Sequence, residues 1–139
     1  MNLASSRRTI VVVAGVIAVN DRVLVTQRPR GSHLEGAWEF PGGKVEDDED
    51  PRDALRRELR EELGVDAIVG AILETSFHRY DSKSVLLLFF DARLADGSPP
   101  PTAIEVADLR WRRADELRDE DFPPADVPVL DRVRAMLRR

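Results

Sequence analysis

Apolar residues gather in segments of strand length, separated by polar breaks. The longest run, residues 10–19, is rich in Val and Ile, ends at Asn20-Asp21, and is followed by the apolar residues 23–25. This pattern predicts a β-hairpin with a tight polar turn. Four further strands are predicted at residues 38–40, 67–74, 85–93 and 109–111. The segment 85–93 is almost continuously apolar, which favours a central place in a sheet.

One helix is predicted between Pro51 and Gly64. Leucines recur every fourth residue, as a buried helical stripe requires, at positions 55, 59 and 63. Asp50 suits the N-cap, Pro51 the first helical position and Asp53 the third position of a capping box. Gly64 stands where a helix ends.

A last helix is predicted over residues 128–137, again from its apolar spacing. Pro41-Gly42-Gly43 should break the short strand before it, and residues 28–36 and 95–103 read as loops. Strands and helices in this order predict an α/β sandwich with a mixed sheet between helices. We expect residues 1–8 to be a flexible N-terminus and residues 9–139 to form one domain.

The amino-acid composition excludes several kinds of functional site. The chain has 139 residues, no cysteine and only two histidines, His33 and His78. Disulfides, thiolate metal sites, cysteine nucleophiles and a three-histidine zinc site are therefore excluded. A net charge of −5 argues against binding duplex nucleic acid.

The apolar run of residues 10–19 is about half as long as a membrane helix. Paired Arg7 and Arg8 before it are also one form of export signal, but its β-branched residues favour a strand. We therefore expect a cytoplasmic protein without a membrane partner.

The predicted helix carries three glutamates on one face. Glu58, Glu61 and Glu62 stand at i, i+3 and i+4, so their charges repel. One interpretation is a surface salt-bridge lattice with neighbouring arginines. The other is a hard divalent cation such as Mg²⁺ or Mn²⁺, which oxygen ligands select and which often bridges carboxylates to phosphates.

The wider spacing favours the metal. Gly43 is followed after five residues by Glu49, and after seven more by the run Arg57-Glu58-Leu59-Arg60-Glu61-Glu62-Leu63-Gly64-Val65. This pattern resembles the Nudix box of the Nudix hydrolases at every fixed position. The resemblance implies the Nudix-type α/β/α sandwich, and the flanking segments fit that fold over nearly the whole chain.

The resemblance also implies roles for residues. Glu58, Glu61 and Glu62 would bind the divalent metal, with the backbone carbonyl of Gly42 as a further ligand. Arg57 would hold a neighbouring glutamate in place, and Glu49 would support the loop. Because glycine has no Cβ, Gly42-Gly43 also lets the backbone approach phosphate and metal closely.

Outside the box, residues 38–44 and 122–129 resemble the MutT-like branch, which cleaves nucleoside triphosphates to monophosphate and pyrophosphate. Arg28 and Lys44 match positions expected to contact the nucleotide. Glu105 matches a loop glutamate that reaches the metal site and serves as ligand or base; an exposed loop acid is the alternative. Asp126 replaces the asparagine of MutT proper, as in the cytidine-triphosphate pyrophosphohydrolases.

Asp126 also precedes the last helix, so it is equally a candidate N-cap. His33 and His78 are expected at a loop or strand edge, and Tyr80 in packing.

The resemblance therefore implies a Mg²⁺-dependent hydrolase, with Mn²⁺ as a substitute, acting on a nucleoside triphosphate with a cytosine- or guanine-type base, oxidised and modified bases included. The alternatives are another nucleoside diphosphate derivative, such as a dinucleoside polyphosphate, and a non-catalytic nucleotide-sensing module. The expected partner is the nucleotide alone, and the protein is expected to be a monomer or homodimer.

Overall fold

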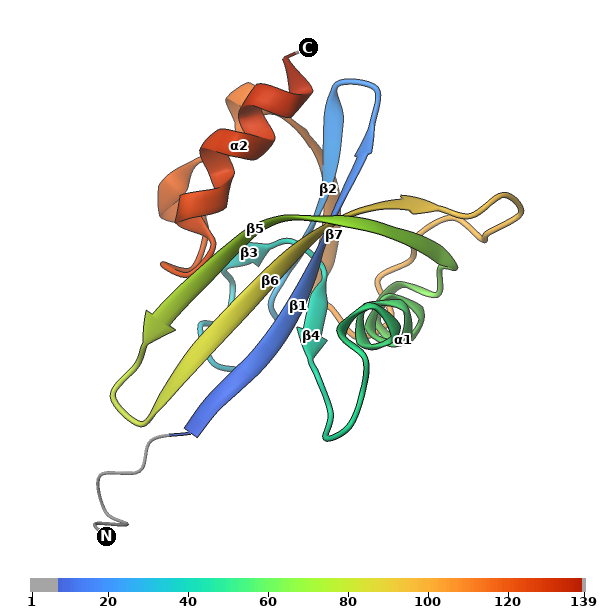
Figure 1. Ribbon diagram of the computed structural model, residues 1–139. Helices are drawn as coiled ribbons and strands as arrows, with labels where there is room; N and C mark the ends of the chain where they lie inside the picture. Colours follow the sequence, from blue (N-terminus) through green and yellow to red (C-terminus); the bar gives the residue numbers. More distant parts are fainter. Residues whose placement is uncertain (1–7, 139) are drawn as a thin grey trace, which may run out of the picture.

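A seven-stranded mixed sheet lies between two helices in the computed structural model, which describes residues 8–138 (Figure 1). The strands are β1 (Arg8–Val19), β2 (Arg22–Gln27), β3 (Trp38–Glu39), β4 (Gly42–Lys44), β5 (Ala67–Arg79), β6 (Lys83–Leu94) and β7 (Asp108–Arg113). The helices are α1 (Pro51–Leu63) and α2 (Val127–Leu137), with 3-10 turns η2 (Ala114–Glu116) and η3 (Asp119–Asp121). The predicted α/β sandwich is confirmed.

Strand β1 organises the sheet because both of its edges are paired. One edge runs parallel to β6 from Arg8 to Ile17, which places β6 between β1 and β5, as its apolar sequence predicts. The other edge of β1 pairs with β4 at Val12–Ala14 and, nearer its end, with β2. The turn at Asn20 joins β1 to β2. The sheet order is β3-β2-β1-β6-β5, with β7 added beside β2.

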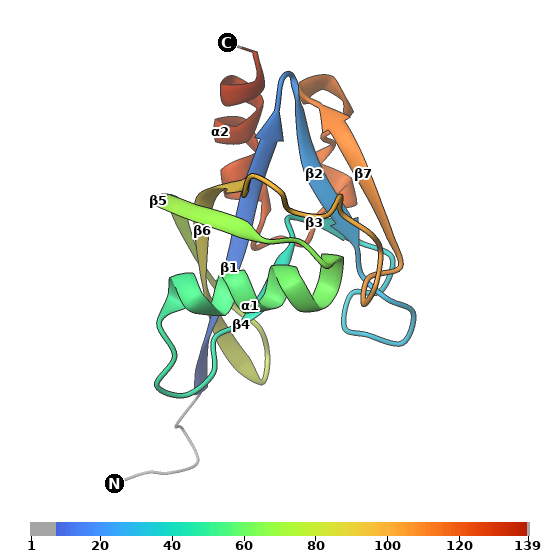
Figure 2. The same ribbon diagram turned by 90° about the vertical axis from the view of Figure 1, so that its right-hand side faces the viewer.

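Two apolar cores lie on opposite faces of the sheet, as the turned view in Figure 2 helps to follow. Helix α1 contributes Leu55, Leu59 and Leu63 to one core, all fully buried, so the predicted stripe is confirmed. Helix α2 contributes to the other core, around Phe40 and Phe89. The alternation of β1 side chains serves both cores: Val13 and Ile17 face α1, whereas Ala14 and Val16 face α2.

The start of α1 differs from the prediction in one contact. The Asp50 carboxylate accepts a hydrogen bond from the N–H of Arg52 at 2.8 Å, so the predicted N-cap is confirmed. Asp53 does not complete a capping box; its carboxylate pairs with Arg56 Nη1 at 2.7 Å. Arg56 lies about one helical turn further along and is a charged donor, which forms a stronger hydrogen bond to a carboxylate than a backbone N–H does. Asp53 therefore binds Arg56 and not the backbone at the start of the helix.

The predicted break after the short strand is confirmed, since β3 ends at Glu39 and Pro41 lies outside any strand. The sequence did not predict that Gly42–Lys44 forms a strand of its own, β4, which pairs with Val12–Ala14 of β1. A Cβ on Gly42 would lie 1.9 Å from the carbonyl oxygen of Val13, so the pairing needs glycine there.

The expected loose segment of residues 1–8 lies outside the described residues except for Arg8, the first residue of β1. Neither helix within residues 8–138 is long and apolar enough to cross a membrane.

Candidate functional site

Helix α1 presents its glutamates toward β4 and the loop before the helix. The Glu58 side chain is 17% exposed and that of Glu61 49% exposed. A Cβ on Gly43 would lie 2.4 Å from the Glu58 carboxyl carbon, so β4 passes directly under this carboxylate. The sequence-predicted glycine and glutamate are therefore brought together.

Arg57 holds the loop and the helix together. Its Nε and Nη2 donate to the two carboxylate oxygens of Glu49 at 2.9 and 3.0 Å, and Nη2 also donates to the carbonyl of Lys44. Its Nη1 donates to Glu58 at 3.0 Å and to Glu61 at 3.3 Å. The hydrogen bonds from Arg57 lower the pKa of Glu49, so this forked contact is an ionised pair.

Glu62 is the least compensated member of the cluster. Its pKa is raised to about 8, first by burial and then by the negative charges of Glu39 and Glu58, while a hydrogen bond from the Gly42 N–H opposes the shift. Within the described range 8–138, no donor reaches the buried Oε1 of Glu62. Burial also raises the pKa of Glu58, against the lowering effect of Arg57.

These features fit a divalent cation. Buried carboxylates that repel one another, with an oxygen lacking a donor, are stabilised when a cation neutralises them. Among residues 8–138, no three acidic or histidine side chains already converge as a preformed ligand set. Arg57 instead contacts Glu58 and Glu61.

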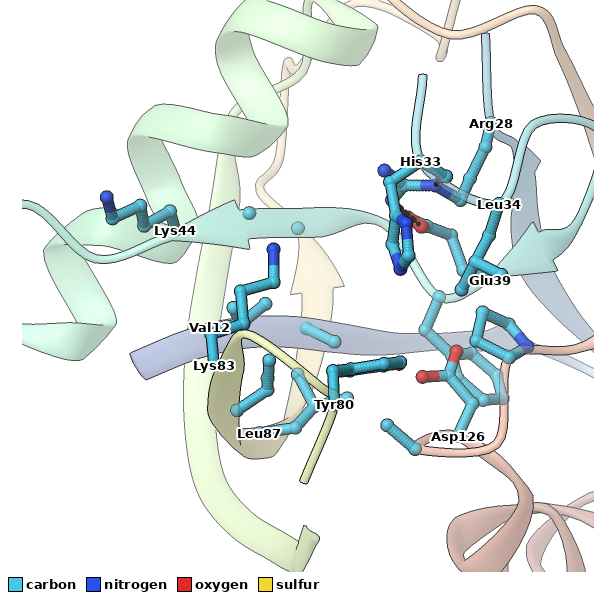
Figure 3. A pocket seen from close by; sticks show the side chains of 17 residues that line it. Val12, Arg28, His33, Leu34, Glu39, Lys44, Tyr80, Lys83, Leu87 and Asp126 are labelled. Carbon is cyan, nitrogen blue, oxygen red and sulfur yellow. Dashed lines mark hydrogen bonds and ion pairs between the residues drawn. The ribbon is translucent and has the colours of Figure 1, made fainter. Parts of the chain in front are cut away.

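Gly43, which lies against Glu58, also lines a pocket of about 300 Å³. Figure 3 shows this pocket. Side chains of β1 and β6 form an apolar floor, and β4 runs along one side. The lining residues are Val12, Ala14, Arg28, His33, Leu34, Glu39, Phe40, Gly42, Gly43, Lys44, Tyr80, Lys83, Val85, Leu87, Pro123, Ala125 and Asp126. The predicted residues Arg28, Lys44 and Asp126 therefore share one cavity.

An acidic wall closes one end of the pocket. Arg28 Nη1 donates to both carboxylate oxygens of Glu39 at 2.9 Å. Asp126 is 5% exposed, and burial raises its pKa well above the ordinary value, with Glu39 adding to the effect. In Figure 3, Asp126 lies at one end of the pocket, and Lys44 and Lys83 lie toward the other.

The N-cap interpretation of Asp126 is wrong. The residue stands at the cap position of α2, but across residues 8–138 its side chain forms no capping hydrogen bond. Its carboxylate accepts from the Phe40 N–H instead. Its backbone angles of φ −88° and ψ −23° are helical, whereas an N-cap residue is typically extended.

The pocket also contains an aromatic residue, Tyr80, that the sequence did not place in the site. Tyr80 lines the pocket, and its ring packs edge-on against His33 at 5.4 Å and His78 at 4.5 Å between ring centroids. Burial, and then the charge of Asp126, raise the pKa of the Tyr80 hydroxyl. Packing was expected for Tyr80, but the sequence did not indicate that it packs at the pocket.

Glu39 and Lys83 were also missed. Glu39 is the last residue of β3, inside the run 38–44 that resembles the MutT-like branch, and Lys83 is the first residue of β6. The pairing of β3 with β2 and of β6 with β1 brings both residues to the pocket. A signal was present for Glu39, since an acidic residue lies between the apolar Trp38 and Phe40 of a short strand.

Glu105 approaches the cluster from the connection between β6 and β7. Its N–H donates to the backbone carbonyl of Glu62 at 3.2 Å. Its negative charge contributes to the raised pKa values of Glu58 and Glu62, although its own side chain is exposed. The structure therefore brings Glu105 near the carboxylates.

Comparison with known proteins identifies the family. The NUDIX domain model matches residues 7–133. CTP pyrophosphohydrolase of Escherichia coli (strain K12) is 37% identical over 129 residues, which cover 93% of this chain and 94% of that protein. Putative 8-oxo-dGTP diphosphatase 2 of Mycobacterium tuberculosis (strain H37Rv) is 41% identical over 119 residues, 84% and 82% of the two chains.

Solved structures agree in fold. The solution structure of the E. coli ORF135 protein superposes with a TM-score of 0.78 at 36% identity, over 98% of this chain and 95% of that one. MutT of methicillin-resistant Staphylococcus aureus 252 gives a TM-score of 0.76 at 36% identity, over 94% and 99%. This chain therefore belongs to the Nudix family of hydrolases.

Proposed function

We propose that this Nudix hydrolase cleaves a nucleoside triphosphate to a monophosphate and pyrophosphate, with Mg²⁺ as the cofactor and Mn²⁺ as a substitute. One observation carries the proposal: β4 joins the two parts of the site. Gly43 lies under Glu58, and the same strand lines the pocket that holds Asp126. A base in the pocket therefore directs its phosphates along Gly42–Gly43 toward the glutamates of α1. Two relatives named above are a CTP pyrophosphohydrolase and a putative 8-oxo-dGTP diphosphatase.

Glu58, Glu61, Glu62 and the carbonyl of Gly42 would hold the cation. When bound, it would spread the charge that develops on the phosphoanhydride. Arg57 keeps Glu58 and Glu61 on one side of the helix and, through Glu49, fixes the loop that begins it. Lys44 contacts the phosphate chain, and Glu105 acts as a ligand or as the base that accepts a proton from the attacking water.

Asp126 and Arg28 recognise the base. An ionised Asp126 accepts hydrogen bonds and cannot donate, so it matches bases that present amino or ring N–H groups. Cytosine offers an amino group, and guanine-type bases offer an amino group and a ring N–H. Thymine and uracil would turn carbonyls toward the carboxylate. Cytosine- and guanine-type triphosphates, oxidised ones included, are therefore the expected substrates.

A nucleotide panel tests the proposal. Purified protein with Mg²⁺ is given CTP, dCTP, dGTP, 8-oxo-dGTP, UTP, dTTP and a dinucleoside polyphosphate, and the products are separated by anion-exchange chromatography. Release of pyrophosphate from a cytosine- or guanine-type substrate supports the proposal, with Glu62→Gln as the control for contaminating phosphatases. Cleavage of only a dinucleoside polyphosphate contradicts it, and no turnover of any nucleotide favours a sensing module.

A further inference from the structure

The connection between β6 and β7 is fastened to the C-terminal end of α1. The N–H of Thr102 donates to the carbonyl of Leu63 at 3.0 Å, and those of Ile104 and Glu105 donate to the carbonyl of Glu62 at 3.0 and 3.2 Å. The last carbonyls of a helix have no partner within the helix. Residues 102–105 supply the missing donors.

Other contacts fix the two ends of this connection. The Asp66 N–H donates to Ser98 Oγ at 2.9 Å, and the Ala95 N–H donates to the carbonyl of Asp66 at 2.8 Å. At the far end, the Ala107 N–H donates to the carbonyl of Gln27 at 3.0 Å. The connection between β6 and β7 is therefore held at both ends, and its hydrogen bonds to the end of α1 fix the position of Glu105.

Ile104 makes an unusual contact at this point. Its side chain is 57% exposed, so burial contributes little to holding it. Its Cδ1 lies only 3.0 Å from where a Cβ of Gly64 would stand, and Gly64 has a φ of 69°. The left-handed turn favours glycine at this position, and a Cβ there would press against the terminal methyl of Ile104, which would have to shift by a few tenths of an ångström.

We propose that Ile104 and Gly64 are positioning residues, which seat the segment 102–105 on the last turn of α1 and so hold Glu105 beside Glu58 and Glu62. Glu62 is the shared element: its carbonyl accepts the N–H of Glu105, and its carboxylate belongs to the cluster. The loop is therefore joined to the helix at the residue that carries one of the carboxylates. The inference rests on the proposed participation of Glu105 in hydrolysis.

Amide hydrogen exchange tests the seating without any substrate. In the wild-type protein, the N–H groups of Thr102, Ile104 and Glu105 should exchange slowly in NMR spectra. In Ile104→Ala, exchange at Glu105 should be about threefold to tenfold faster, because local opening becomes easier. Ile72→Ala is the matched control, since Ile72 is 46% exposed on β5. Exchange at unstructured-peptide rates in the wild-type protein would overturn the inference.

Kinetics test whether the seating acts through Glu105. Ile104→Ala should lower kcat about threefold to tenfold and leave KM within about twofold, because a general base contributes about 10²–10⁴-fold and is only loosened here. In a Glu105→Gln background the same substitution should have no further effect. An equal loss in both backgrounds would show that Ile104 acts through the fold.

Two outcomes separate this inference from the proposed function. A wild-type rate for Glu105→Gln removes Glu105 from the reaction and contradicts its proposed role. A slow Glu105→Gln together with an unaffected Ile104→Ala contradicts the positioning role alone.

Glycine substitutions give a second, independent comparison. Gly64 and Gly97 both have a positive φ, but a Cβ on Gly97 meets nothing within 4 Å. Both Gly64→Ala and Gly97→Ala carry the backbone strain, but only in Gly64→Ala does the new Cβ press against the side chain of Ile104. We expect kcat to fall in Gly64→Ala and to be retained in Gly97→Ala; equal kcat values would contradict the proposal.

Discussion

Asp126 concentrates the residue-scale chemistry of the pocket. Its carboxyl group is almost fully buried and accepts a hydrogen bond from the Phe40 N–H. The negative charge of Glu39 also raises the pKa of Asp126. Both burial and the neighbouring negative charge disfavour ionisation, so more of the neutral form is present than for an ordinary aspartate. A neutral carboxyl donates one hydrogen bond, which a uracil carbonyl accepts; an ionised carboxylate does not.

Selectivity should therefore depend on pH. As the pH rises through the raised pKa of Asp126, the ratio of turnover of a guanine-type triphosphate to that of UTP should increase, because the ionised form rejects the uracil carbonyls. Asp126→Asn does not titrate, so its ratio should stay flat while pyrophosphate release continues. Competition assays with both nucleotides in one tube measure the ratio directly. A variant that keeps the wild-type pH profile would remove Asp126 from base recognition.

Strand β4 and helix α1 form the element that joins pocket and carboxylates. Two adjacent glycines of β4 face different obstacles: Gly42 faces the backbone of β1, and Gly43 faces the flexible end of the Glu58 side chain. A backbone atom cannot move without breaking the sheet, whereas a carboxylate can swing away.

The two alanine variants should therefore fail in different ways. Gly42→Ala should lower the free energy of unfolding by about 3 kcal/mol or more, because the new Cβ overlaps the Val13 carbonyl. Gly43→Ala should cost about 1 kcal/mol yet reduce turnover about tenfold or more, because Glu58 is displaced. Urea unfolding and steady-state kinetics separate the two effects. Similar stability losses in both variants would contradict this division.

At the scale of the whole molecule, the buried acidic cluster should make the stability of the metal-free protein depend on pH. The folded pKa of Glu62 is about 8, against an ordinary value of 4.5. A group with a raised folded pKa contributes its full stability below the unfolded pKa and loses it as the pH rises through the folded pKa. The folded state is therefore weakened between these two values.

Urea unfolding of the metal-free wild type and of Glu62→Gln should show this loss. Relative to the variant, the wild type should lose at most about 1.4 kcal/mol per pH unit across that window. Mg²⁺ at the upper end of the window should raise the wild-type melting temperature, because a cation that binds only the folded state stabilises it. Glu62→Gln should lack most of that rise and lose about a hundredfold or more in turnover. A folded variant with wild-type turnover would contradict the metal assignment.

Structural features that depend only on residues close together in the chain can be predicted from the sequence. The hairpin of β1 and β2, the start of α1 at Asp50 and its buried leucine stripe follow from local turn chemistry and helical spacing, which need no knowledge of distant residues. The stretch from Gly43 to Glu62 is also continuous in sequence, running through the end of β4, one loop and helix α1. The carboxylate cluster and the family it indicates are therefore predictable from the sequence alone.

Contacts between segments that are far apart in the chain follow from the tertiary structure and not from any local pattern. The parallel pairing of β1 with β6 brings Lys83 and Tyr80 to the pocket, and the packing of α2 brings Asp126 to Glu39. Local reasoning assigned Asp126 equally to a helix cap, because a short polar side chain before a helix satisfies that rule on its own. The partner of Asp126 is instead the Phe40 N–H, in the connection between β3 and β4 more than eighty residues earlier in the chain, and no local sequence pattern contains that contact.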